Sequence, residues 1–326
     1  MARPDFPRTV FEFQSRFATE EACAQFLIAS RWPDGFQCPK CGSTTFYWIG
    51  DKKLMQCQSC RRQTSPTAGT IMHRSKQPLV VWFWAAYTVA THTPGLSAVQ
   101  LQRQLGPQTS YKTAFMLLHK LRAAMVREGR ERLRGVVEVD ESFVGGPDPG
   151  GGRRHIGNKA LVIGAVEVRG ERAGRVRLRV IPNGTQVTLE KFLRENVEPA
   201  TEVRTDAYAG YFGLIDEGYM HIPRVQGGGQ NAPVILPHIH RVFANLKTWL
   251  LGTHHGAVRK QHLQAYLNEF VFRYNRRQTP MAAFQTILGL IEERRGPTYK
   301  GLYGIAKGEE EYVHPTNPTL RVRRRA

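Results

Sequence analysis

Four of the five cysteines in the chain stand in two close pairs whose spacing is typical of a metal site, Cys38-x2-Cys41-x15-Cys57-x2-Cys60. Two such pairs joined by a short hairpin form a zinc ribbon, in which four thiolates hold one Zn²⁺ and leave no open position for catalysis. A redox motif needs only one pair, and an iron–sulfur site fits the spacing less well. We therefore expect structural zinc at these four thiols.

Two aspartates, a histidine and a lysine form a second set, with the chemistry of phosphodiester cleavage. Asp140 lies in VVEVDESFVGG and Asp206 in TEVRTDAYAGY. Two converging carboxylates suit Mg²⁺ or Mn²⁺ better than zinc, and such ions stabilise the attacking and leaving oxygens of a phosphodiester. In PHIHRVFANLK, His240 and Lys247 are seven residues apart. That spacing is about two helical turns, or about 10 Å on one face, so His240 would reach the ions and Lys247 a phosphate.

The elements around these residues indicate how they would be brought together. After residue 135 the chain has three β-rich runs, VVEVDESFVGG, ALVIGAVEV and RVRLRVIP, then the helical TLEKFLREN, the strand of TEVRTDAYAGY and further helices. This order predicts an α/β fold with an RNase H-like core, in which one carboxylate lies midway along the first strand and another ends the neighbouring fourth strand. Either Asp140 or Asp206 alone would more often be a loop cap or a surface residue. Glu141 should point to the opposite face of its strand.

A helical segment lies between the ribbon and the sheet. Pro78 opens the apolar helix of QPLVVWFWAAYTVATHT, Ser97 caps the short SAVQLQRQL, and Ser110 caps the longer TSYKTAFMLLHKLRAAMV. A short helix, a tight turn and a longer helix form a helix-turn-helix pattern, which would place Tyr111 and Lys112 in a DNA major groove. A plain helical linker between the ribbon and the next domain is the alternative.

The charge of the chain points to a polyanionic partner. It has 46 Lys+Arg against 27 Asp+Glu, a net charge of +19, and nucleic acid is the commonest partner of such a surplus. Arg153, Arg154 and Lys159, in the loop after the first strand, are candidate phosphate contacts, with a solvated loop as the alternative. The sequence shows no signal peptide and no apolar run long enough for a bilayer. We expect a cytoplasmic, nucleoid-associated protein without disulfides.

The patterns divide the chain into four segments: an N-terminal helix with the zinc ribbon at 1–75, the helix-turn-helix-like unit at 76–130, the RNase H-like catalytic domain at 131–290, and a basic tail at 291–326. The tail ends in LRVRRRA, which would add non-specific affinity for DNA.

Several motifs resemble those of bacterial insertion-sequence transposases that carry an N-terminal zinc ribbon: CPKC…CQSC, GTIMHRSKQPL, VEVDESFVGG, RTDAYAGY, HRVFANLKTWLLGTHHG and YLNEFVFRYNRR. The resemblance extends over residues 13–277 and implies a catalytic pattern of Asp, Asp, then Glu, Asn or His, and Lys seven residues later. Applied to this sequence, the pattern makes Asp140 and Asp206 metal ligands, gives His240 the third position and makes Lys247 the lysine. Because a neutral imidazole binds Mg²⁺ poorly, orientation of a water or of the scissile phosphate is the alternative role of His240.

The resemblance implies a two-step reaction on DNA. Water attacks the phosphodiester at a terminal inverted repeat and frees a 3′-hydroxyl, which then attacks a target phosphate, without a covalent protein intermediate. A homo-oligomer is expected because two element ends are handled together. The alternatives are an inactive zinc-ribbon regulator that only binds DNA and a structure-selective nuclease. Asp140, Asp206 and Lys247 argue against the regulator, which would need none of them.

Overall fold

The computed structural model describes residues 6–50, 54–127, 129–145, 159–225, 235–256, 258–291 and 296–298. The chain forms two compact units, one made of residues 1–126 together with 278–326 and the other of residues 127–277. None of the helices in the described ranges is long and apolar enough to cross a bilayer.

The first unit is mostly helical, and its helices begin where the sequence places capping residues. The hydroxyl of Ser97 accepts a hydrogen bond from the N–H of Gln100, and that of Ser110 accepts one from the N–H of Thr113, each at 3.2 Å. The helices are α1 (Val10–Arg16), α2 (Glu20–Arg31), α3 (Leu79–Thr91), α4 (Ala98–Leu105), α5 (Tyr111–Ala124) and α10 (Pro280–Ile291).

An aromatic cluster explains why α10 belongs to this unit. Phe284 of α10 is fully buried, and its ring lies 5.5 Å from that of Phe13 and 5.6 Å from that of Tyr87. The sequence predicts that residues 278–290 belong to the catalytic domain, whereas the compact second unit ends at residue 277. The apolar pattern of α10 predicts a buried helix but does not reveal which core buries it.

The first unit also contains a small antiparallel sheet in the order β1-β2-β3. Its strands are β1 (Phe46–Ile49), β2 (Leu54–Cys57) and β3 (Gln63–Thr64). Phe46 pairs with Cys57 and Ile49 with Leu54, so β1 and β2 form the hairpin that the sequence predicts between the two cysteine pairs.

The second unit is built on a five-stranded sheet in the order β6-β5-β4-β7-β8. Strands β4, β5 and β6 are antiparallel neighbours, and β7 lies parallel to β4 on its other side. This is the predicted RNase H-like arrangement, in which the fourth strand lies beside the first. The strands are β4 (Val136–Val144), β5 (Ala160–Arg169), β6 (Arg172–Ile181), β7 (Glu202–Asp206) and β8 (Met220–Arg224).

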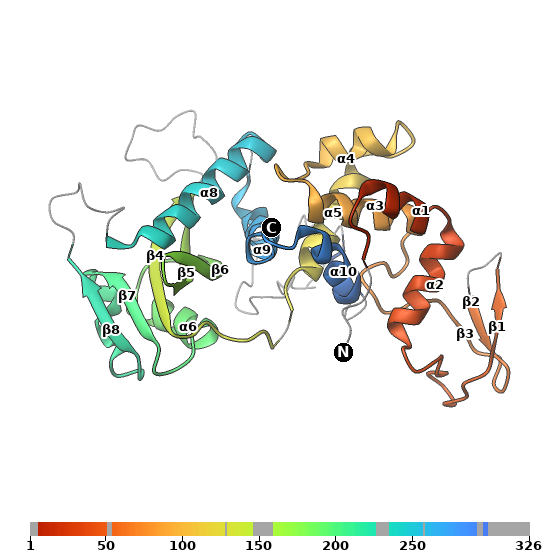
Figure 1. Ribbon diagram of the computed structural model, residues 1–326, viewed down its shortest axis with the longest axis horizontal. Helices are drawn as coiled ribbons and strands as arrows, with labels where there is room; N and C mark the ends of the chain where they lie inside the picture. The colour runs from red at the N-terminus through yellow and green to blue at the C-terminus, as the bar shows by residue number, and fades with distance from the viewer. Residues whose placement is uncertain are drawn as a thin grey trace, which may run out of the picture. The chain divides into compact units, whose positions relative to one another are not determined.

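Helices cover both faces of this sheet (Figure 1), with α8 (Pro237–His254) and α9 (Lys260–Asn275) on one face and α6 (Gln186–Asn196) on the other. The 3₁₀ helix η1 (Ala209–Leu214) joins β7 to β8 and packs with α6. Along β4, Val137 and Val139 enter the core under α6, and Val144 enters the core under α8. Since side chains alternate along a strand, Asp140 faces α8 and Glu141 faces the α6 side.

Candidate active site and zinc ribbon

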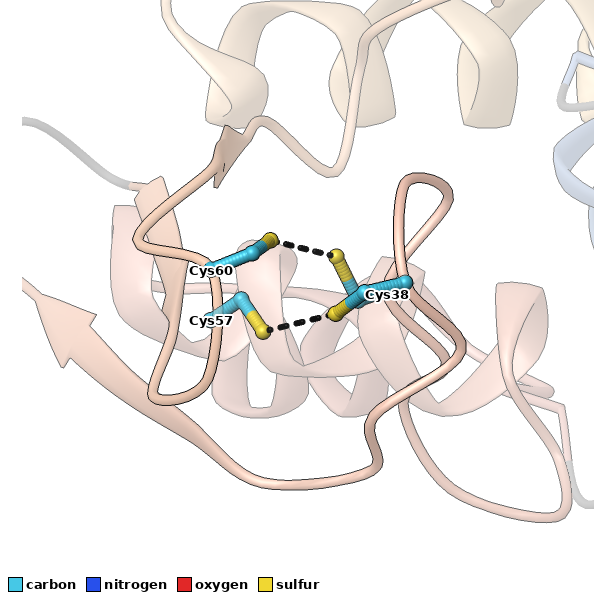
Figure 2. Close-up of side chains that lie close together, drawn as sticks. Cys38, Cys57 and Cys60 are labelled. Carbon is cyan, nitrogen blue, oxygen red and sulfur yellow. Dashed lines mark hydrogen bonds between the residues drawn. The ribbon is translucent and has the colours of Figure 1, made fainter.

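The four cysteine sulfurs of the ribbon lie within 4.8 Å of one another. The sulfurs of Cys38 and Cys60 are 3.6 Å apart, as are those of Cys41 and Cys57. Figure 2 shows Cys38 facing Cys57 and Cys60 across the cluster. Thiolates bound tetrahedrally to one Zn²⁺ at about 2.3 Å would be separated by about 3.8 Å, so the cluster has the size of a four-cysteine zinc site.

The two halves of the cluster have the same backbone geometry. The N–H of Gly42 donates to the carbonyl of Cys38 at 2.9 Å, and the N–H of Arg61 donates to the carbonyl of Cys57 at 3.0 Å. Both donors have a positive φ, +73° at Gly42 and +57° at Arg61. A hydrogen bond from the backbone N–H of Cys60 lowers the pKa of Cys57 to about 6, which favours a thiolate at this position, whereas the pKa of Cys41 is raised to about 12 beside the other three sulfurs.

Three of the residues expected at the catalytic site meet between β4 and α8. Asp140 occupies the middle of β4, and its Oδ2 lies 3.7 Å from Nε2 of His240. Two residues further along the same face of β4, the hydroxyl of Ser142 accepts a hydrogen bond of 2.7 Å from the Nζ of Lys247. The face that His240 and Lys247 share is therefore the face of α8 that lies against β4.

Asp206, the last residue of β7, reaches the same place from the neighbouring strand. The last residue pair between β4 and β7 joins Glu138 to Arg204, and Asp140 and Asp206 each lie two residues further on. The alternation of side chains puts both carboxylates on one face of the sheet. Oδ1 of Asp206 also accepts a hydrogen bond of 3.1 Å from the N–H of Tyr208, which fixes the carboxylate at the strand end.

Electrostatics distinguish Asp140 from an ordinary surface carboxylate. Burial and the nearby carboxylate of Asp206 raise the pKa of Asp140 to about 6, against the opposing effects of the N–H of Glu141, of His240 and of Lys247. A buried carboxylate beside a second one is a signal of a functional site and of an affinity for cations. The oxygen donors therefore fit a hard divalent cation.

The site is open compared with the ribbon. Among the residues that the structure describes, the four cysteines form the only group of three or more candidate ligands with all ligand atoms within 4.8 Å of one another. The candidate ligand atoms of Asp140, Asp206 and His240 do not all lie within that distance of one another. Such an arrangement suits Mg²⁺, which is usually held by one or two carboxylates together with substrate phosphates and waters.

Glu141 points away from this set, as the sequence predicts. Its Oε1 accepts a hydrogen bond of 2.6 Å from the hydroxyl of Tyr211, which belongs to the core on the α6 side. Burial and the carboxylates of Asp140 and Asp206 raise the pKa of Glu141 to about 7, although the hydrogen bond from Tyr211 opposes the rise. Glu141 thus contributes charge to the region without facing His240.

The structure also reveals contacts that sequence reasoning missed. Besides Ser142, buried Glu138 lies on the Asp140 face of β4 and binds the first turn of α8, including His238. The alternation along β4 is the sequence signal that could have placed Glu138, Asp140 and Ser142 on one face. Their partners on α8 lie about a hundred residues later in the sequence, and no sequence pattern shows that these residues contact β4.

The residues expected to contact DNA are only partly described. Tyr111 is the first residue of α5 and is 47% exposed, and Lys112 beside it is exposed. Lys159 is exposed directly before β5. Arg153 and Arg154 lie outside the described residues.

The strand order and the four-cysteine cluster define an RNase H-like domain that follows a zinc ribbon. Residues 132–275 match the family model of the ISXO2-like transposase domain, and residues 18–63 match that of the transposase zinc-ribbon domain. These matches assign the two domains to the zinc-ribbon and catalytic domain families of insertion-sequence transposases.

A relative supports the same assignment. An uncharacterized protein in transposable element ISH50 of Halobacterium salinarum is 27% identical over 292 residues, which are 83% of this chain and 97% of that protein. The crystal structure of the catalytic core domain of BIV integrase is similar over 52% of this chain and 91% of its own, at 17% identity and a TM-score of 0.24. The fold assignment rests on the strand order, because so low a score adds nothing to it.

Proposed function

We propose that this chain is a DNA transposase that cleaves the ends of an insertion sequence and joins the freed 3′-hydroxyl to target DNA. The observation that carries the proposal is the convergence of Asp140 and His240, at 3.7 Å, with Asp206 directed to the same face of the sheet. The transposase domain match over residues 132–275 covers all of these residues.

Each residue has a role that follows from its place. Asp140 and Asp206 would hold Mg²⁺ or Mn²⁺, which supplies Lewis-acid stabilisation of charge on the phosphodiester oxygens. Lys247 would release Ser142 and contact a DNA phosphate, because its side chain is exposed beside the site. His240, which contacts Asp140 through Nε2, would either complete the metal site or orient the water or the scissile phosphate.

The rest of the chain would bind DNA. The net charge of +19 favours a polyanion, and the exposed start of α5 offers Tyr111 and Lys112 to a major groove. Lys159 would add a phosphate contact near the site, and Arg153 and Arg154 are proposed as further phosphate contacts. We further propose that the protein works on the nucleoid as a homo-oligomer, because one reaction must handle two element ends.

End cleavage tests whether the protein is an enzyme. Duplex DNA with the element's own end is incubated with wild type, Asp206→Asn and Asp216→Asn in Mg²⁺ and in Mn²⁺. Asp216 is an exposed aspartate of the same unit and is the matched control. We expect cleavage by wild type and Asp216→Asn and none by Asp206→Asn. A wild type that binds the end and never nicks it in either ion would instead establish the DNA-binding regulator.

The role of His240 is tested in the same assay with His240→Ala. If the imidazole is a ligand, the variant should be rescued poorly by either ion. If it orients a water or a phosphate, the variant should keep part of its activity in both.

A further inference from the structure

The carboxylate of Glu138 lies at the start of α8 and is almost completely buried, with 2% of the residue exposed. Its Oε2 accepts hydrogen bonds from the backbone N–H groups of His238, at 2.8 Å, and of Ile239, at 2.9 Å. Its Oε1 lies 2.8 Å from Nδ1 of His238. All three contacts join one side chain of β4 to the first turn of a helix that begins about a hundred residues later.

These bonds complete the N-terminus of α8. Its N-cap residue, Leu236, provides no side-chain cap, and Pro237 at the first helical position has no N–H. The N–H groups of the next two residues both bind Glu138, and the N–H of His240 makes the first bond within the helix, to the carbonyl of Leu236 at 3.2 Å. Glu138 of the sheet thus caps the helix in place of the serine or aspartate that usually stands at the N-cap position.

The same face of β4 carries the catalytic set. Glu138, Asp140 and Ser142 alternate along the strand and contact, in order, His238, His240 and Lys247 of α8. The contact at Glu138 therefore fixes where α8 starts relative to Asp140. Because a helix is stiff, a shift of its first turn moves His240, two residues later, by a similar distance.

A close approach beside Asp140 keeps α8 in this position. Gly164 of β5 pairs with Asp140, and a Cβ at Gly164 would lie 2.8 Å from Cδ1 of Ile239 and 3.0 Å from Cζ of Phe243. The helix therefore packs directly onto the strand backbone at the point where the site lies.

We propose that Glu138 is a positioning residue that anchors the N-terminus of α8 to β4 and so holds His240 at Asp140. The inference about catalysis rests on the proposed transposase function, whereas the anchoring of the helix does not. The length of the Glu138 side chain matters more than its charge. The backbone N–H groups of His238 and Ile239 need an oxygen acceptor within hydrogen-bond distance, and this acceptor need not be charged.

Two substitutions separate reach from charge. Glu138→Gln keeps the length and an oxygen acceptor, and the neutral imidazole of His238 can accept a bond from the new amide. Glu138→Asp keeps the charge but withdraws the carboxylate by one methylene. The matched control is Glu167→Asp, which shortens an equally buried carboxylate of the same sheet that binds Arg169 and Arg175.

The experiment combines hydrogen exchange at single amides with single-turnover cleavage of end DNA by the full chain. In Glu138→Asp we expect the amides of His238 and Ile239 to exchange about tenfold faster than in wild type. We expect cleavage to slow by about 10²-fold, since a displacement of about 1 Å can cost that factor, with unchanged affinity for the DNA. Glu138→Gln should resemble wild type in both measurements, and Glu167→Asp should keep the protection of both amides.

Opposite outcomes would overturn the proposal. Two results would show that the carboxylate of Glu138 is merely structural. In the first, Glu138→Asp resembles wild type more closely than Glu138→Gln does. In the second, Glu138→Asp slows cleavage no more than Glu167→Asp does at equal stability. Unchanged exchange of His238 and Ile239 in Glu138→Asp would show that Glu138 does not anchor the helix. If wild type cleaves nothing, the proposed function fails, and the exchange data still decide whether the anchor exists.

Discussion

Replacement of Asp140 by asparagine should stabilise the protein at pH 8 in the absence of added Mg²⁺, although it removes a residue of the proposed active site. Burial raises the pKa of Asp140 to about 6, well above the ordinary value near 4. A rise of that size corresponds to about 3 kcal/mol as an upper limit, because one pKa unit is about 1.4 kcal/mol. The side chain is only 15% exposed, so solvent screens little of this penalty.

The sign of the pH dependence follows from the proton balance. Between about pH 4 and pH 6, the carboxyl of Asp140 binds a proton in the folded protein and has lost it in the unfolded chain. The contribution of the protonated carboxyl to the free energy of unfolding is therefore fully present below about pH 4. It is lost as the pH rises through about 6. Asp140→Asn should thus match wild type near pH 4 and exceed it at pH 8.

Calorimetry of the full chain checks this prediction. About 2–3 kcal/mol in a unit of this size should raise the melting temperature by about 5–10 °C at pH 8. Added Mg²⁺ should raise the melting temperature of wild type, because an ion that binds only the folded state stabilises it, and should leave Asp140→Asn unchanged. Asp216→Asn should behave as wild type throughout. A less stable Asp140→Asn at pH 8, or one whose melting temperature still rises with Mg²⁺, would contradict this prediction.

Three further predictions test other parts of the structure. Cys57→Ser should lower the bound zinc from about one ion per chain to near none, as measured by atomic emission, because four thiolates are needed. Cys23→Ser should keep the zinc, because Cys23, the buried fifth cysteine, lies outside the cluster. Lys112→Ala should weaken binding to end DNA and reduce the salt slope by about one, and an unchanged slope would place α5 away from the phosphates. Gly164→Ala should cost about 1–3 kcal/mol in urea unfolding by pushing Ile239 outward, and a midpoint equal to that of wild type would contradict the close packing.

Much of the fold could be predicted because its signals are local. The alternation of apolar residues in VVEVDESFVGG indicates a strand, and the order of elements then gives the sheet in which β7 lies beside β4. The cysteine spacing likewise predicts a cluster that the structure shows with sulfurs 3.6 Å apart. Ser97 and Ser110 cap the helices that the sequence assigns to them.

The contacts that were missed depend on tertiary structure. Glu138 reads as one acidic residue of a strand, and only the position of α8 turns it into a helix cap. Gly164 gives no sign that Ile239 lies where its Cβ would be. Arg61 takes a left-handed conformation in the second cysteine loop, where a glycine would be expected, because the geometry of the metal loop imposes it.

Joining of DNA ends tests whether the protein transfers DNA strands as a transposase does. Labelled DNA with a 3′-hydroxyl already exposed at the element's end is incubated with a target plasmid, Mg²⁺ and wild type, Asp206→Asn or Asp216→Asn. We expect plasmid molecules covalently joined to the label with wild type and Asp216→Asn and none with Asp206→Asn. A wild type that cleaves the ends but never joins them would contradict the transposase assignment and show a nuclease of the same fold.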